Sequence, residues 1–348
     1  MSAIQNVAIV GVCPVLISRP SKRDNTDYFE AGGHIGGAFA RALIQAGKHV
    51  VTALSRFDSK SQLPIGANIV RVNYEDVQSI AEALKGQHFL VITLAATAPE
   101  ETHAKIVKAA AEAGVPYIMP NAFGYPTYQD NLCEQDLYTR VIRGGIANRV
   151  SDIQRSGAAS VVLCCGFWYE WTLAMGEPSF GFSIRDRKLT FFDDGKRTIT
   201  VSTWEQCGLA LASLLSLPET ATSPSLADYK NRNVLISSFT ISQRDILDSL
   251  HRVLGTSDDD WDIRYESSAQ RVKEGAEEMR EGSQRGFIKW LCANTFLPGN
   301  IASDFTDKEV ANSVLGLPEE DLDDATKRVV TRLENGWSPF EELGKGSN

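Results

Sequence analysis

The sequence predicts an α/β protein in which helices cover both faces of a doubly wound parallel sheet, followed by a smaller α+β region. Two observations support this prediction. Between Val7 and Cys165, short apolar runs alternate with amphipathic stretches, which is the pattern of βαβ units. From residue 166 onward, shorter runs separated by turn residues replace that alternation. We therefore expect a first domain over residues 1–165 and a second, substrate-binding domain over residues 166–348, part of which returns to the sheet.

Each element of the first half has its own signal. Phe39, Leu43 and Ile44 share one helical face ahead of Gly47, and an alanine-rich helix ends at Gly114, where a glycine cap is typical. Short β-branched runs predict the strands. The expected strands are Val7–Gly11, His49–Leu54, Asn68–Val72, Phe89–Leu94, Val115–Met119 and Ala159–Cys165, and further helices are expected at Val77–Leu84, Glu100–Ala113 and Leu132–Gln154.

The second half has a different pattern. Residues 182–192 alternate and meet Asp193-Asp194-Gly195 ahead of Thr198–Val201, which predicts a β-hairpin between these two runs. We expect this half to lie over the carboxyl edge of the sheet, where open α/β folds bind ligands. Its other expected elements are helices at Trp204–Leu215, Ile246–Leu254 and Ala269–Leu291, and a strand at Val234–Ser237.

Composition argues against several classes of protein. The 348 residues have a net charge of −9, which argues against direct binding to nucleic acid or to an anionic membrane. No apolar run approaches the roughly 20 residues of a membrane span. Six scattered cysteines without a CxxC pair predict neither a metal site nor a disulfide framework. Because no secretory signal pattern is visible, we expect a reducing, cytoplasmic setting; the oligomeric state stays open.

A glycine-rich turn indicates the ligand. Val7-Ala8-Ile9-Val10-Gly11 predicts a strand that ends in glycine, and Ala31-Gly32-Gly33-His34-Ile35-Gly36 predicts the opening of a helix. Joined, they form the strand–GxxGxxG–helix unit of Rossmann-type folds, whose helix N-terminus holds a dinucleotide pyrophosphate through free backbone N–H groups. The alternative is a turn that serves only close packing. The expected phosphate-binding residues are Gly11, Gly33, His34, Ile35 and Gly36.

The second predicted strand indicates which cofactor is bound. It ends in Ser55-Arg56. An acidic residue at this place would contact the ribose 2′-hydroxyl of NAD, whereas arginine suits the 2′-phosphate of NADP. The sequence therefore predicts NADP(H), and the alternative is a solvated charge at a strand end.

Two further strand ends complete the expected cofactor site. Small residues where the fourth strand ends let a cofactor approach the backbone, and the fifth strand ends where the nicotinamide should lie. The residues at these two ends are Leu94, Ala95, Asn121, Ala122 and Phe123.

Five motifs spread along the chain share their pattern with one protein family. They are Gly11 joined to Ala31-Gly32-Gly33-His34-Ile35-Gly36, the strand end at Arg56, Tyr117-Ile118-Met119-Pro120-Asn121-Ala122-Phe123-Gly124, Gly166-Phe167-Trp168-Tyr169-Glu170 and Ser202-Thr203-Trp204-Glu205-Gln206. Together they resemble the NmrA-like and isoflavone-reductase-like branch of the atypical short-chain dehydrogenases, in its fungal form. The resemblance covers nearly the whole chain except residues 12–30. It implies an NADPH-dependent reductase, or an NADPH-binding regulator, with a Rossmann domain and a smaller substrate domain.

The catalytic residues that the resemblance implies are missing. Short-chain dehydrogenases typically use a Tyr-x-x-x-Lys pair, and none of the nine tyrosines has a lysine four residues later. Isoflavone-reductase-like enzymes instead have a lysine on the helix after the fifth strand, but no lysine occurs between Ala109 and Arg187. We assign no catalytic residue. Tyr125, Tyr128 and Tyr169 remain candidate proton donors, with packing roles as the alternative.

An aromatic run follows the sixth strand. It consists of Phe167, Trp168, Tyr169 and Trp171. One interpretation is a wall for a flat, apolar or aromatic substrate. The other is a core between the two domains.

Residues 12–30 interrupt the glycine turn. They include Pro14, Pro20 and Lys22-Arg23-Asp24 and show no period, at a place where a compact unit has its tightest turn. One hypothesis is a translated, retained intron, because Val12-Cys13 can be encoded by a 5′ splice-site sequence and Glu30 by a codon that ends in AG. We expect the fold to survive, since loop closure costs roughly a few kcal/mol, and NADPH affinity to fall.

Three functions follow as alternatives. The first is an NADPH-dependent reductase of a small, aromatic or secondary-metabolite substrate. The second is a non-catalytic NADP(H)-sensing protein that binds a partner, which the missing lysine favours. The third is a form of either that the insertion has disabled.

Overall fold

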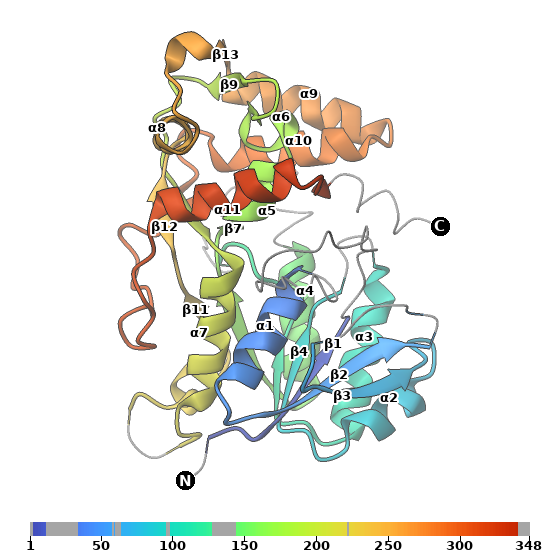
Figure 1. Ribbon diagram of the computed structural model, residues 1–348. Coiled ribbons are helices and arrows are strands. Elements are labelled where there is room, and N and C mark those ends of the chain that lie inside the picture. Colours follow the sequence, from blue (N-terminus) through green and yellow to red (C-terminus); the bar gives the residue numbers. More distant parts are fainter. Residues whose placement is uncertain are drawn as a thin grey trace.

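The computed structural model describes residues 3–11, 34–57, 59, 64–94, 98–126, 144–220 and 223–339. Figure 1 shows a lower unit built on a sheet and an upper unit rich in helices, with helix α11 (Leu322–Glu334) at the junction between them. Residues 12–33 lie outside the described part, so the predicted insertion at 12–30 and most of the glycine turn do as well.

The lower unit is organised around a sheet of seven strands in the order β11-β6-β5-β4-β1-β2-β3. Every pairing within it is parallel. Because parallel neighbours need crossover connections, helices cover the faces of such a sheet, and the predicted doubly wound α/β fold is confirmed. The strands are β1 (Asn6–Val10), β2 (Val50–Arg56), β3 (Asn68–Val72), β4 (Phe89–Ile92), β5 (Tyr117–Met119), β6 (Ala159–Cys164) and β11 (Arg232–Leu235).

Helices pack on both faces of this sheet. They are α1 (His34–Gln45), α2 (Val77–Leu84), α3 (Glu100–Glu112), α4 (Gly144–Arg155) and α7 (Trp204–Ser216). Val7 and Ile9 of β1 lie in one core with α1 and α7. Ala8 and Val10 lie in a second core with α2 and α3. Burial on both faces explains why the strand has no polar residue between Val7 and Val10.

One predicted helix agrees with the structure at its end, and another is described only in part. Helix α3 ends as expected, because Gly114 follows its last turn with a φ of +75°, a conformation that glycine adopts without steric cost. The helix expected at Leu132–Gln154 is represented by α4, which begins at Gly144, and residues 127–143 lie outside the described part.

The upper unit contains two small sheets and most of the remaining helices. Its core gathers apolar residues from both sheets and from α11. One sheet has the order β12-β10-β7 and the other β13-β9-β8. The strands are β7 (Phe167–Trp168), β8 (Phe182–Ser183), β9 (Lys188–Phe192), β10 (Ile199–Ser202), β12 (Phe239–Ile241) and β13 (Asp262–Glu266), and the helices are α5 (Tyr169–Ala174), α6 (Glu177–Phe180), α8 (Gln243–Leu254), α9 (Ser268–Arg280) and α10 (Gln284–Thr295).

The predicted hairpin between residues 182–192 and Thr198–Val201 is wrong. Strand β9 pairs with β8 and β13, whereas β10 pairs with β7 and β12 in the other sheet. The turn itself is present, with positive φ at Asp193 and Gly195. The Asp193 carboxylate, however, accepts the backbone N–H of Ser268 at 3.1 Å. It therefore fixes the start of α9 instead of closing a hairpin.

The single helix expected at Ala269–Leu291 is also wrong, because the structure has two helices there. Gly282 has a φ of +87°, and the Ser283 hydroxyl accepts the N–H of Gly286 at the start of α10. The two helices then pack very closely. A Cβ on Gly275 would lie 2.5 Å from the backbone nitrogen of Trp290. Gly275, in the middle of this helical pattern, therefore marks a close contact between the two helices.

Candidate functional site

Two glycines bring the first helix against the carboxyl edge of the sheet. Gly11 has a φ of +91°, and a Cβ there would lie 2.7 Å from the carbonyl oxygen of Thr93. A Cβ on Gly36 would lie 2.7 Å from the Thr93 hydroxyl. The end of β1 and the first turn of α1 therefore both pack on the end of β4. Gly33 and Ala95 lie outside the described residues.

Hydrogen bonds from Tyr74 join the ends of neighbouring strands. The Tyr74 hydroxyl accepts the N–H of Gly11 at 3.0 Å and donates to the carbonyl of Leu54 at 3.3 Å. The Thr93 hydroxyl donates to the carbonyl of Val10 at 3.0 Å. These contacts fix the ends of β1, β2 and β4 where a dinucleotide would cross them. Sequence reasoning missed this role of Tyr74.

At the end of β2, Arg56 is exposed, as a contact to a bound cofactor requires. The loop that follows it is held by Arg71 of β3. The Arg71 Nη1 donates to the Ser55 hydroxyl at 2.9 Å, to the carbonyl of Arg56 at 2.9 Å and to the carbonyl of Ser59 at 3.0 Å. Sequence reasoning missed Arg71, because a lone arginine in an edge strand resembles a solvated charge.

The end of β5 is fixed from two sides. The Asn121 amide donates to the carbonyl of Leu94 at 3.0 Å, and Arg149 of α4 donates to the carbonyl of Asn121 at 2.7 Å. Arg149 also pairs with Glu100 of α3 at 2.6 Å. Of the predicted residues here, Leu94 and Asn121 are joined by this hydrogen bond. Ala122 and Phe123 are buried. The main chain at the expected nicotinamide position is thus held by two helices.

His103 lies close to this network. Its side chain is 2% exposed, and both ring nitrogens lack a hydrogen-bond partner in the described part of the chain. Burial, assisted by the positive charge of Arg149, lowers the pKa of His103 from 6.5 to about 4. The imidazole is therefore neutral at physiological pH.

The three candidate proton donors have different surroundings. The Tyr125 hydroxyl donates to the carbonyl of Thr200 at 3.4 Å, and its ring meets the edge of Phe167 at 5.6 Å. Tyr169 is fully buried in the upper core with its hydroxyl 2.6 Å from that of Thr326, and burial raises the pKa of that hydroxyl far above its ordinary value. Tyr128 lies outside the described residues.

The aromatic run lies where the two units meet. Phe167, Trp168 and Trp171 are partly buried, and Trp171 packs against both the lower and the upper core. The Trp168 indole N–H is buried without a hydrogen-bond partner among the residues described. Phe167 and Tyr125 face one another at this junction, whereas Tyr169 points away into the upper core.

A cluster of four side chains, the tryptophan cluster, connects the first residue of α1 to the upper unit. The His34 ring stacks on Trp204 with centroids 4.3 Å apart, and its edge meets Trp337 at 5.6 Å. The Arg332 guanidinium lies over both tryptophan rings, at 5.1 and 5.6 Å. The Trp204 backbone N–H donates a hydrogen bond to the buried carboxylate of Glu170 at 3.1 Å. Four distant parts of the chain thus meet at the helix start.

Comparison with known proteins identifies the domain that these strand ends form. Residues 31–147 match the family model described as NAD(P)H-binding. Residues 31–147 are an NAD(P)H-binding domain. Within it lie His34, Arg56 and Asn121, three of the residues that the sequence assigned to the cofactor.

Similarity extends over most of the chain. An oxidoreductase of Aspergillus flavus, aprR, is 26% identical over 86% of this chain and 96% of its own length. The crystal structures of pinoresinol-lariciresinol and phenylcoumaran benzylic ether reductases cover 94% of this chain and 99% of theirs, with a TM-score of 0.70 and 17% identity. An NADPH complex of an Escherichia coli quinone oxidoreductase covers 93% and 99%, with a TM-score of 0.62 and 15% identity. The resemblance seen in the sequence is confirmed at the level of the fold.

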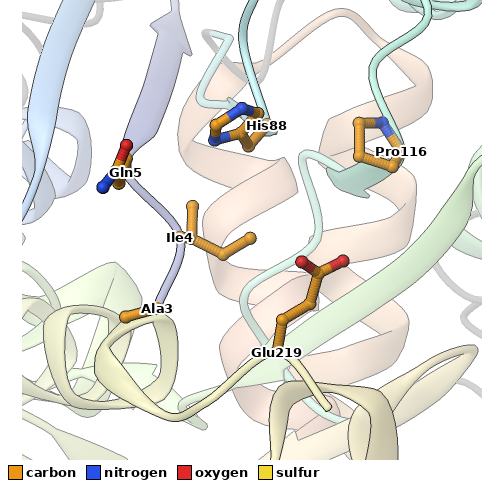
Figure 2. Close-up of a pocket in the computed structure, with 6 residues that line it drawn as sticks. All are labelled: Ala3, Ile4, Gln5, His88, Pro116 and Glu219. Atoms are coloured by element: carbon orange, nitrogen blue, oxygen red, sulfur yellow. The ribbon is translucent and has the colours of Figure 1, made fainter. Parts of the chain in front are cut away.

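A cavity of about 100 Å³ lies at the opposite end of the sheet from the carboxyl edge. Figure 2 shows it where β1, β4 and β5 begin. Open α/β sheets bind ligands at the carboxyl ends of their strands, so we assign no function to it. Its lining residues are Ala3, Ile4, Gln5, His88, Pro116 and Glu219.

The described residues contain no group of three or more histidine, cysteine or acidic residues placed to hold a metal ion. None of their helices is both long enough and apolar enough for a membrane crossing.

Proposed function

We propose that this protein is an NADPH-dependent reductase of a small, flat and largely apolar molecule, of aromatic or secondary-metabolite type. The observation that supports this best is the carboxyl edge of the sheet. There the exposed Arg56, the start of α1 and the doubly fixed Asn121 follow one another along the strand ends. This is the order in which the 2′-phosphate, pyrophosphate and nicotinamide of a bound NADPH would meet them. The similarity to a fungal oxidoreductase over 86% of the chain agrees with it.

Each part of the edge has a role in this proposal. The backbone N–H groups at the start of α1 bind the pyrophosphate, and Arg56 binds the 2′-phosphate. The main chain at Asn121 and Ala122 positions the nicotinamide ring. The bound cofactor supplies the hydride, and the protein orients the rings and excludes water.

The substrate lies, in this proposal, between the strand ends and the aromatic run. Phe167 and Tyr125 present ring faces and edges at the junction of the two units, which suits a flat apolar molecule. Similar structures are named for an NADPH-dependent quinone oxidoreductase and for pinoresinol-lariciresinol reductases, so quinones and pinoresinol-type lignans are the first classes to test. Tyr125 is the described tyrosine best placed to give a proton to the reduced substrate.

A cytoplasmic setting is part of the proposal. The described cysteines, Cys164, Cys165, Cys207 and Cys292, are free and buried, as is typical of proteins that fold under reducing conditions.

A second candidate is a non-catalytic NADP(H)-sensing protein. It is favoured by the absence of lysine between Ala109 and Arg187 and by the burial of the Tyr169 hydroxyl. In that case the same edge binds the cofactor, and the junction of the two units changes shape for a protein partner instead of holding a substrate.

The deciding experiment measures NADPH and NADH binding by calorimetry, and then NADPH oxidation with a quinone, an enone and a lignan. The full chain and a variant that lacks residues 12–30 are compared. The reductase proposal predicts tighter binding of NADPH than NADH and turnover with at least one substrate class. Binding without turnover in both proteins supports the sensor. Binding by the deletion variant alone shows that the insertion disables the site.

A further inference from the structure

The loop after β2 is held by an arginine on the neighbouring strand. The parallel register of β2 and β3 places Ser55 opposite Arg71 and Arg56 opposite Val72. Paired residues on adjacent strands project from the same face, so the Arg71 side chain rises beside Ser55, which is only 1% exposed. From there its Nη1 reaches the carbonyls of Arg56 and Ser59 as well as the Ser55 hydroxyl.

The geometry of these bonds leaves part of the guanidinium free. One Nη has two protons, so three acceptors within 3.0 Å of Arg71 Nη1 must share them. A guanidinium has about five N–H donors in all. Those on Nε and Nη2 of Arg71 have no hydrogen-bond partner among the described residues, and the three acceptors that it does contact are uncharged. The positive charge of Arg71 is thus fixed in place and not neutralised by these contacts.

The charge of Arg71 lies at the end of β2, where it can contribute to phosphate recognition. The end of β2 is where a Rossmann-type site contacts the ribose 2′ position, and Arg71 touches the backbone of Arg56 itself. Phosphate favours planar, bidentate donors, and a side chain that is already held in place loses less conformational entropy when it binds. In a chain with a net charge of −9, two adjacent arginines at this edge are a local exception.

We propose that Arg71 determines the preference for a 2′-phosphate, as the second cation of the adenosine 2′-phosphate site and as the anchor that positions Arg56. This inference rests on the NADP(H) preference in the proposed function. It adds a residue that the pattern at the end of β2 does not indicate, since Arg71 lies 15 residues beyond Arg56 in the chain.

The test uses two small probes that do not need a nicotinamide site and that share the 5′-phosphate expected at the glycine turn. Adenosine 2′,5′-bisphosphate and adenosine 5′-monophosphate differ only in the 2′-phosphate, so the ratio of their dissociation constants isolates its contribution. The ratio is measured by calorimetry for the full chain and for Arg71→Met, Arg71→Lys and a control, Arg232→Met. Arg232 is an exposed arginine on β11, at the opposite edge of the same sheet.

The full chain should prefer the bisphosphate, and Arg71→Met should reduce that preference about 10- to 100-fold, as the loss of charge-assisted bonds to a phosphate implies. Arg71→Lys should restore part of it, because the charge returns without the three-acceptor geometry. Arg232→Met should leave it unchanged. Binding of the monophosphate should change little in every variant.

Two results would overturn these proposals separately. If the full chain binds both probes equally, the NADP(H) preference in the proposed function fails, and this inference fails with it. If the full chain prefers the bisphosphate but Arg71→Met keeps the full preference, only the role of Arg71 is refuted. Equal weakening of both probes in Arg71→Met would also refute it, since it would show a purely structural role for the arginine.

Discussion

His103 is a buried titratable side chain without a hydrogen-bond partner among the described residues, and this has a consequence for stability. Its pKa is about 4 in the folded protein and 6.5 as the ordinary value. Between these values the unfolded chain binds a proton that the native protein does not. The free energy of unfolding therefore falls as the pH drops below about 6.5 and levels off below about 4.

The expected size of this effect can be measured. Between pH 7 and pH 5, protonation of His103 in the unfolded state should lower the free energy of unfolding by about 2 kcal/mol. In His103→Leu that part of the pH dependence should disappear, whatever the stability of the variant at pH 7. Urea unfolding at the two pH values gives the difference. An unchanged difference in the variant would show that other groups cause it.

Tyr125 makes a second prediction at the scale of one side chain. If its hydroxyl protonates the reduced substrate, Tyr125→Phe should lower kcat by about 100-fold, the lower end of what general acid catalysis contributes. The dissociation constant for NADPH should stay the same, because the hydroxyl contacts the carbonyl of Thr200 and not the cofactor path. Stopped-flow binding and steady-state turnover separate the two effects. A kcat within twofold of the unmodified protein would leave Tyr125 with a packing role.

Side-chain roles could be predicted only where the backbone requires them. Gly11 and Gly36 were predicted because no other residue allows the approach that each makes to Thr93. The direction of Tyr169 could not be predicted, since it begins a helix of six residues whose inner face has no readable period. Arg71 was missed because its three acceptors come from another strand and its loop.

The contact between α9 and α10 gives a prediction at the scale of the element. Helix propensity alone would make Gly275→Ala stabilising by about 1 kcal/mol. In the structure, the new Cβ would lie 2.5 Å from the backbone nitrogen of Trp290. We therefore expect the opposite sign, a loss of about 2 kcal/mol from overpacking. Thermal unfolding of this variant and of Lys273→Ala, an exposed site on the same helix, checks it. Stabilisation by Gly275→Ala would contradict the close contact.

Element boundaries followed the sequence where signals are local. The ends of α3 before Gly114 and of α8 at Leu254 need only neighbouring residues. The start of α8 was missed, because the helix begins at Gln243, three residues ahead of the expected Ile246. The pairing of β9 with β13 joins segments some 70 residues apart and depends on a turn whose carboxylate serves another helix. Such contacts depend on tertiary packing. A hairpin pattern in the sequence is local and carries no information about that packing.

At the scale of the whole molecule, the tryptophan cluster joins the NAD(P)H-binding domain to the C-terminal part of the chain. Trp337 and Arg332 contact Trp204 and His34, and His34 begins the helix that should bind pyrophosphate. Trp337→Ala should weaken NADPH binding about fivefold to tenfold, since an aromatic pair contributes about 1 kcal/mol. Calorimetry with the full chain gives the constants.

A matched control is available in the upper unit. Trp261 is buried to a similar extent, with 6% of its surface exposed against 9% for Trp337, but it packs on Phe182 and His251, outside the cluster. Trp261→Ala should lower the thermal stability without changing NADPH affinity. Equal losses of affinity in both variants would show that stability, and not the cluster, controls binding.

The general architecture was predictable because few arrangements satisfy the rules for parallel sheets. Alternation of strand and helix patterns predicted the parallel sheet, though not its seven strands or their order, and its carboxyl edge remains the predicted place of the site. The junction between the units was not predictable. It is made by contacts among His34, Trp204 and Trp337, which come from distant segments, and no pattern in one segment indicates its contact with the others.

The tryptophan cluster also places two fluorescent side chains beside the start of α1. Two of the six tryptophans, Trp204 and Trp337, lie 5.8 Å apart, and both rings contact His34 at the start of α1. A dihydronicotinamide absorbs in the range where indole emits. Occupancy of the site should therefore quench the fluorescence of these two indoles more than that of Trp261 or Trp290 in the upper unit, and the protein contains its own optical probe for titrating the cofactor.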